Sequence, residues 1–159
     1  MTTPNDIADR LRRTMHGPMW HGPAVLDAVG DLSAHEAAQH PIPGAHSAWE
    51  LVLHVAAWAE IAEARMNGRA WIEPSLIEDW PPAAAIPTER AWSAAKRRAV
   101  NAYKALARAV GTRPVESLTA PVIGHAYTQR EMLDGVVEHG VYHAAQIVLL
   151  RRVSGRTTV

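Results

Sequence analysis

Apolar side chains recur every three or four residues along four long stretches of the chain, which is the spacing of one buried face of an α-helix. Strand-like alternation is weak throughout. Two shorter helical segments are expected between the first and second stretches, over 23–30 and from Ser33 for one or two turns. The pattern predicts long helices over 5–16, 47–66, 88–110 and 128–153.

Capping residues mark where these helices begin. Ser47 and Glu50 lie three residues apart, as do Thr128 and Glu131. In this spacing the hydroxyl and the carboxylate satisfy backbone N–H groups that the first helical turn leaves free. Asn5 is the expected cap of the first helix. Glycine or proline follows the predicted helix ends, where the chain must leave the helical conformation.

Two long connections, 69–87 and 111–127, separate the last three long helices. The first contains four prolines and two tryptophans and is far longer than a turn between neighbouring helices requires. A helix of about 20 residues is about 30 Å long, so such a connection can run back along the bundle and leave its flanking helices parallel. We therefore predict an all-α fold, a four-helix bundle with a long crossover connection, as a single domain over 1–159.

Composition narrows the functional classes. Of the 159 residues, 48% are apolar and 20% are charged, the balance of a globular protein. Formal net charge is zero, so we expect neither nucleic acid nor a membrane as a partner, and we interpret the basic face of 88–110 as solvated. The N-terminus lacks a signal-peptide pattern and no stretch could span a bilayer, so a cytoplasmic location is expected.

Cysteine is absent and histidine is frequent, and together they define the candidate chemistry. The lack of cysteine excludes disulfides, thiolate metal sites and cysteine nucleophiles. The nine histidines are scattered along the chain rather than gathered in a tag. Any metal that this chain binds must therefore have nitrogen or oxygen ligands.

His139 and His143 lie four residues apart in the last predicted helix, so their side chains point the same way. Both belong to the apolar face of that helix, which comprises Met132, Val136, His139, His143, Ile147 and Leu150. Two such imidazoles can bind one metal ion through bonds of about 2.0–2.1 Å. Hydrogen bonds to tyrosine, glutamate or backbone groups are the alternative way to satisfy buried imidazoles.

His54 borders the apolar face of the helix over 47–66, between Leu51 and Trp58. A lone inward histidine is more often a hydrogen-bonded core residue than a metal ligand. Three inward histidines on two helices are accounted for together by one metal site. From spacing alone, the metal-bound and the hydrogen-bonded alternatives both stay open.

Three segments carry a family resemblance: WHGP at 20–23, HSAWELVLHVAAW at 46–58 and EHGVYHAAQI at 138–147. They resemble the DinB-like (YfiT-type) superfamily, most specifically in the second and fourth long helices. The resemblance implies a four-helix bundle with a long crossover, often dimeric. It also implies that a histidine of the second helix and an HxxxH pair of the fourth hold zinc or nickel. These positions match His54, His139 and His143 here.

The resemblance also bears on activity. Some relatives depend on a thiol: transferases that use bacillithiol, and mycothiol-dependent maleylpyruvate isomerases. Three neutral histidines leave at least one coordination position open, which is typical of catalytic metal sites. The resemblance therefore implies a metal-dependent thiol transferase or hydrolase that acts on a small-molecule substrate, with a low-molecular-weight thiol as partner and a homodimer as the assembly.

Further candidates surround the three histidines. His21 and His46 lie in loop-like segments beside helix starts, and each is a candidate acid, base or additional ligand, with a surface or capping role as the alternative. Glu50 lies one turn before His54. It is a candidate hydrogen-bond partner for a ligand imidazole, with its capping-box role as the alternative.

Tyr142 and Gln146 flank the HxxxH pair and are expected either to orient a substrate or to satisfy the core. Trp58, with Trp71 and Trp80, is a candidate wall of a pocket; the alternative is that these tryptophans are core aromatics in a chain without phenylalanine.

Three functional hypotheses remain at this point. The first is a metal-dependent enzyme, a thiol-dependent transferase or hydrolase. The second is a non-catalytic stress-response or binding module in which the metal only staples two helices together. The third is a metal-free bundle whose core histidines are hydrogen-bonded.

Overall fold

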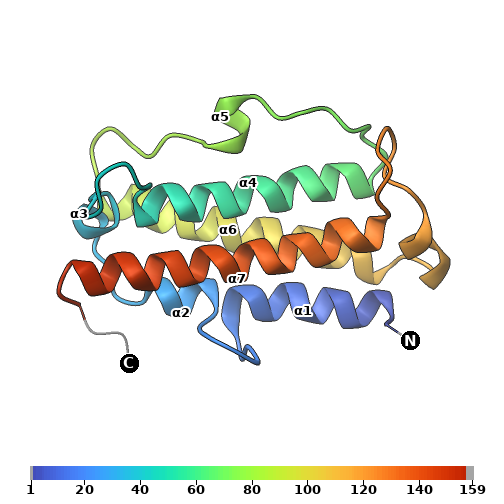
Figure 1. The fold of residues 1–159 in the computed structure, drawn as a ribbon, viewed down its shortest axis with the longest axis horizontal. Coiled ribbons are helices and arrows are strands. Elements are labelled where there is room, and N and C mark those ends of the chain that lie inside the picture. Colours follow the sequence, from blue (N-terminus) through green and yellow to red (C-terminus); the bar gives the residue numbers. More distant parts are fainter. Residues whose placement is uncertain (1, 157–159) are drawn as a thin grey trace.

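The computed structural model describes residues 2–156, and over this range the fold is all-helical, as predicted (Figure 1). Its long helices are α1 (Pro4–His16), α4 (Ala48–Met66), α6 (Glu89–Gly111) and α7 (Gln129–Val153). The short ones are α2 (Val25–Val29), α3 (Ala34–Ala37), α5 (Leu76–Asp79) and the 3₁₀ helix η1 (Val115–Thr119). None of the helices in this range is long and apolar enough to cross a membrane.

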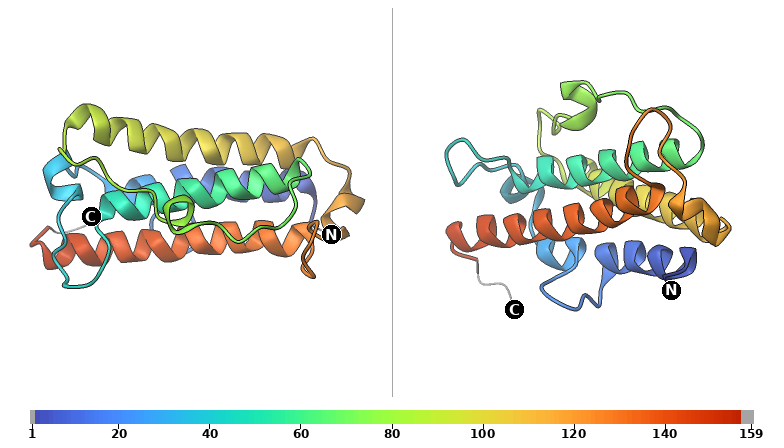
Figure 2. Two further views of the ribbon diagram at one scale, coloured as in Figure 1. Left: turned by 90° about the horizontal axis from the view of Figure 1, so that it is seen from above. Right: turned by 45° about the vertical axis from the view of Figure 1, so that its right-hand side comes forward.

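The four long helices form a bundle with a long crossover connection. In Figures 1 and 2, α4 and α6 run in the same direction, whereas α1 and α7 run the opposite way. The segment 67–88 makes the parallel arrangement possible because it returns along the outside of the bundle from the end of α4 to the start of α6 (Figure 1). This segment, the crossover, carries α5 and passes over one face of α4.

The predicted capping boxes are present at the starts of α4 and α7, but the predicted cap of the first helix is wrong. Asn5 lies inside α1, and Thr3 is the residue that caps it. Thr3 Oγ1 accepts from the Asp6 backbone N–H, and the Asp6 carboxylate accepts from the Thr3 backbone N–H in return. Pro4 suits the first helical position because it has no N–H to leave unpaired.

The core lies between the four long helices and is built around two tryptophans. Trp49 and Trp92 are almost fully buried, with ring centroids 5.2 Å apart. Trp92 Nε1 donates a 2.8 Å hydrogen bond to the backbone carbonyl of Leu32, so the polar atom of the buried indole is satisfied. This rigid centre holds α4, α6 and the turn before α3 in fixed relative positions.

Gly140 lets α7 lie close to α1 and α6. A Cβ atom added to Gly140 would approach the side chains of Thr14 and Tyr103 to within 3.0 Å. Tyr103 is fully buried and its hydroxyl donates to the carbonyl of Val136, one turn earlier in α7. The absence of a side chain at Gly140 therefore sets the position of α7 beside His139.

We expect Gly140→Ala to destabilise the protein by about 1–3 kcal/mol, because an added methyl group must displace packed side chains. Gly135→Ala, one and a half turns earlier in the same helix, is the matched control. Nothing lies within 4 Å of a Cβ atom at Gly135, so alanine should stabilise α7 by up to about 1 kcal/mol. Chemical denaturation measures both changes, and equal effects of the two substitutions would refute the packing role of Gly140.

Candidate metal centre

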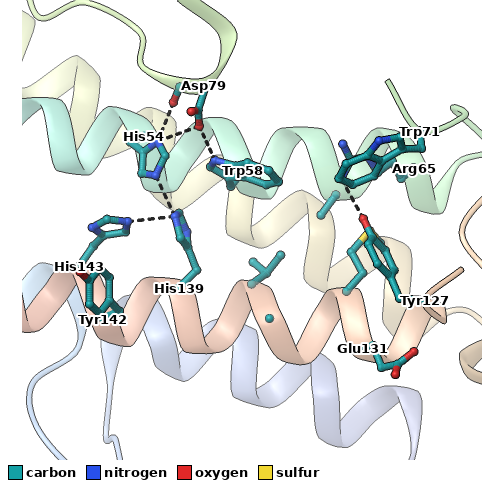
Figure 3. Close-up of a pocket in the computed structure, with 14 residues that line it drawn as sticks. His54, Trp58, Arg65, Trp71, Asp79, Tyr127, Glu131, His139, Tyr142 and His143 are labelled. Atoms are coloured by element: carbon teal, nitrogen blue, oxygen red, sulfur yellow. Dashed lines mark hydrogen bonds and ion pairs between the residues drawn. The ribbon is translucent and has the colours of Figure 1, made fainter. Parts of the chain in front are cut away.

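Three imidazole rings from two helices converge on one point. His54 projects from α4, and His139 and His143 project from α7 across the interface between the two helices (Figure 3). The Nε2 atom of His139 lies 2.9 Å from that of His54 and 3.0 Å from that of His143. His54 and His143 are buried and His139 is half-buried. The three residues singled out by spacing are therefore brought together in the fold.

The outer nitrogens of two rings are held by fixed acceptors. His54 Nδ1 lies 2.6 Å from the backbone carbonyl of Asp79, and His143 Nδ1 lies 2.6 Å from Gln146 Oε1. A carbonyl oxygen only accepts, so each Nδ1 must carry the proton, and each Nε2 then presents a lone pair toward the centre. His139 Nδ1 is buried and finds no hydrogen-bond partner within residues 2–156.

Burial keeps these imidazoles neutral. Removal from water, together with the neighbouring His143 and His54, lowers the pKa of His139 to about 3. Burial also lowers the pKa of His143 to about 4, although the hydrogen bond that His143 Nδ1 donates to Gln146 Oε1 acts in the opposite direction. The pKa of His54 is lowered for the same reason. Neutral imidazole is the form that binds a metal ion.

The depressed pKa values predict that the metal-free protein loses stability in mild acid. Histidines of the unfolded chain take up protons near pH 6.5, whereas His139 and His143 resist protonation until far lower pH. Stability should thus fall as pH decreases from 7 to 5, by at most about 1.4 kcal/mol per pH unit for each histidine. Denaturation in the presence of a chelator measures this slope.

His139→Gln should make the slope between pH 7 and pH 5 shallower, because one titrating group is removed. The exposed His35 provides the control, since His35→Gln removes a histidine from outside the cluster. An unchanged slope in His139→Gln would show that His139 does not resist protonation in the folded state.

The donor set fits one divalent transition-metal ion. With bonds of about 2.1 Å, two nitrogens on one ion lie about 3.0 Å apart at a right angle and about 3.4 Å apart at a tetrahedral angle. The Nε2 separations of 2.9 and 3.0 Å are close to the right-angle value, which is also a hydrogen-bond distance, and all three ligand nitrogens lie within 4.8 Å of one another. Imidazole suits zinc, nickel, copper and iron, whereas calcium and magnesium prefer oxygen. Without a metal, the only proton left for the centre is that of His139. It can serve at most one of the two Nε2···Nε2 contacts fully.

The crossover, in which the sequence marked only Trp71 and Trp80 as candidate pocket residues, supplies one side of the centre. Asp79, the last residue of α5, accepts from His54 through its carbonyl, and its Oδ1 lies 3.3 Å from the same Nδ1. The next residue, Trp80, stacks on the His54 ring at 3.7 Å and on the His46 ring at 3.5 Å, nearly parallel to both. The two imidazoles must therefore lie on opposite faces of the indole.

Three further candidates from the sequence, His46, His21 and Glu50, do not take part in the cluster of Nε2 atoms. His46 is separated from His54 by the Trp80 ring, so it does not face the point where the Nε2 atoms meet. His21 is exposed in the loop between α1 and α2. Figure 1 shows this loop on the opposite side of the bundle from the crossover. Among the described residues, the Glu50 carboxylate forms no hydrogen bond or ion pair with His54. It completes the capping box and lies 2.9 Å from His40 Nε2.

Gln146 satisfies His143, as described above, whereas Trp58 and Tyr142 line the adjacent cavity. Trp58 Nε1 donates a 2.7 Å hydrogen bond to Asp79 Oδ1 and thereby ties α4 to the crossover. Tyr142 is exposed, with its ring 5.1 Å from that of His143. Asp79 was missed because nothing in a proline-rich connection indicates which carbonyl will meet a histidine 25 residues earlier.

A cavity of about 590 Å³ opens beside the three histidines, between α4, α7 and the crossover (Figure 3). Its walls are mostly apolar and include Trp58, Ala62, Met132 and Val136. The volume is that of a small-molecule site. The histidines lie at one end of the cavity, so a bound ion would be accessible to a molecule within it.

The long crossover and the histidine cluster between α4 and α7 define the class: a helical bundle with a site compatible with metal binding. The chain belongs to the DinB superfamily, whose family model matches residues 20–147. No curated protein and no solved structure matches the chain significantly.

Proposed function

We propose that this protein is a metal-dependent enzyme, a thiol-dependent transferase or hydrolase that acts on a small molecule. One observation carries the proposal: three neutral imidazoles converge at the end of an apolar cavity rather than in a sealed core. Three protein ligands with an open side are typical of catalytic sites, whereas structural sites are closed by a fourth ligand.

Each group at the site has a distinct task under this proposal. His54, His139 and His143 would hold the ion, which supplies Lewis-acid chemistry by acidifying a water molecule or thiol and polarising a carbonyl group. Asp79 and Gln146 fix the protons of two imidazoles on Nδ1. The apolar walls exclude bulk water and strengthen electrostatic interactions with the reacting groups.

The test is a turnover assay of untagged protein loaded with zinc or nickel. A thiol such as cysteine, bacillithiol or mycothiol is offered with 1-chloro-2,4-dinitrobenzene, and p-nitrophenyl acetate serves for hydrolysis. We expect turnover that needs the metal and is lost in His139→Ala. A loaded protein that is inactive in every combination would count against an enzyme with this chemistry.

The staple alternative has one specific observation in its favour: the ligands come from two helices, so an ion would join α4 to α7. It predicts that His54→Ala chiefly lowers thermal stability. If His54→Ala keeps the stability of the wild-type protein but loses turnover, catalysis is the better account.

The proposal extends to the metal, the assembly and the location. Zinc or nickel is proposed because three imidazoles suit both ions. A homodimer is proposed, which light scattering after size-exclusion chromatography tests. A cytoplasmic location is proposed because small thiols are kept reduced there.

A further inference from the structure

Arg65 is a buried cation at the end of the cavity remote from the histidines. It belongs to the last turn of α4 and is only 5% exposed, yet it lines the same cavity as His54 (Figure 3). It is the single Lys or Arg among the described residues that line this cavity. A buried guanidinium is costly unless its charge and its five N–H donors are satisfied.

The hydrogen bonds of Arg65 within the protein are long, and both go to neutral groups. Its guanidinium donates to the Tyr127 hydroxyl at 3.3 Å and to the Ile72 carbonyl at 3.4 Å, both long for hydrogen bonds. It also lies 3.9 Å from the centre of the Trp71 ring. No carboxylate comes within 4.0 Å of it in the described part of the chain. Burial lowers its pKa, although Tyr127 and Glu73 act in the opposite direction.

The two acidic residues that line the cavity are already engaged. Glu131 Oε2 accepts from the backbone N–H and the hydroxyl of Thr128, in the cap of α7. Asp79 Oδ1 accepts from Trp58 Nε1 beside His54. The guanidinium therefore faces a mostly apolar cavity, and no carboxylate of the described residues forms an ion pair with it.

The two ends of the cavity are three helical turns apart. His54 and Arg65 are separated by eleven residues, which is about 16 Å along α4. Trp58 and Ala62 line the cavity between them from α4, and Met132 and Val136 line it from α7. A molecule that touches both ends must be elongated, with an apolar middle.

We infer that the cavity binds an elongated substrate with an oxyanion at one end, held by Arg65, and its reacting group at the histidine end. The orientation of this substrate rests on the proposed function, whereas the anion site at Arg65 does not. Arg65 is thus a specificity-determining residue. A carboxylate accepts two parallel N–H bonds from a guanidinium, and a phosphonate offers the same chemistry.

Binding of matched probes tests the inference by calorimetry. Zinc-loaded protein is titrated with 8-mercaptooctanoate, 8-mercapto-1-octanol and 8-mercaptooctylphosphonate. We expect either anion to bind about 10- to 100-fold tighter than the alcohol, the effect of hydrogen bonds to a charged group. The stronger of the two anions identifies the preferred oxyanion. Equal affinity of the three probes would overturn the inference.

Variants locate the anion site. Arg65→Met should remove the advantage of the anion over the alcohol, and Arg65→Lys should retain part of it. Thermal melting checks that each variant is folded like the wild type. Arg69→Met is the matched control, because Arg69 is exposed, lies outside the cavity and carries the same charge. An anion preference that survives in folded Arg65→Met, or disappears in Arg69→Met, would overturn the assignment.

The same comparison with octanoate and 1-octanol on chelator-treated protein separates this inference from the proposed function. A preference for octanoate that depends on Arg65 would support the anion site even if the metal-loaded protein proved inactive. Equal binding of octanoate and octanol, or no binding of either, would contradict the anion site whatever the outcome of the turnover assay.

Discussion

Alanine in place of His139 is expected to reduce the metal content of the purified protein from about one ion per chain to almost none. His139 Nε2 is close to both of the other Nε2 atoms, at 2.9 Å from that of His54 and 3.0 Å from that of His143. Its loss therefore removes the central ligand of the three. Loss of an outer hydrogen-bond partner alone weakens metal binding by about 10- to 100-fold, and loss of a ligand should exceed that. Elemental analysis and competition with a chelating dye measure both quantities.

His46→Ala is the control for this experiment. His46 lies one ring away from His54, behind Trp80, so its removal deletes a neighbouring imidazole without taking away an inward nitrogen. We expect His46→Ala to retain a full equivalent of metal. Undiminished affinity in His139→Ala, or complete loss in His46→Ala, would mean that the ligand set is wrong.

The second large effect is a rise in the melting temperature when zinc or nickel is added to metal-free protein. A ligand present at about 1,000 times its dissociation constant stabilises the folded state by about 4 kcal/mol. For a chain of this size the corresponding rise is about 8–16 °C. Three mutually close nitrogens exist only in the folded state, so the unfolded chain competes poorly for the ion. Differential scanning calorimetry measures the shift.

His54→Ala should abolish most of this rise, because α4 then contributes no ligand. The matched control is His125→Ala, which removes an exposed histidine from the connection before α7. If His125→Ala suppressed the rise as strongly as His54→Ala, the stabilisation would come from metal bound elsewhere on the surface.

Local signals predicted the helices and the HxxxH pair. The Ser47–Glu50 and Thr128–Glu131 capping boxes determine where α4 and α7 begin. Each box spans only four residues, so it can be recognised from local sequence. The inward direction of His139 and His143 follows from helical spacing, which needs no tertiary information. The cap of α1 was misplaced because Asn5 and Thr3 are both good caps, and Pro4 decided between them.

Tertiary contacts decided which residues surround His54. The crossover brings Asp79 and Trp80 onto His54, and no periodicity in a proline-rich segment specifies that register. Glu50 was a candidate partner of His54 because it lies one turn away, yet its carboxylate is used by the cap and by His40. The position of His54 in its helix did not determine which residues it would meet. The fold brings it to His139 and His143.

Arg65 illustrates a second kind of residue that local pattern conceals. In the sequence it is a basic residue in the last turn of a helix, where a cation is expected for electrostatic reasons alone. Only the packing of Trp71 and Tyr127 around it shows that it is buried and faces the cavity.

The central claim is that His54, His139 and His143 together hold one divalent metal ion. Diffraction from crystals grown with zinc or nickel, measured on both sides of the absorption edge of that element, tests it most directly. The account predicts one anomalous peak per chain, about 2.1 Å from each of the three Nε2 atoms. Absence of a peak there, with the three imidazoles hydrogen-bonded to one another or to water, would contradict it.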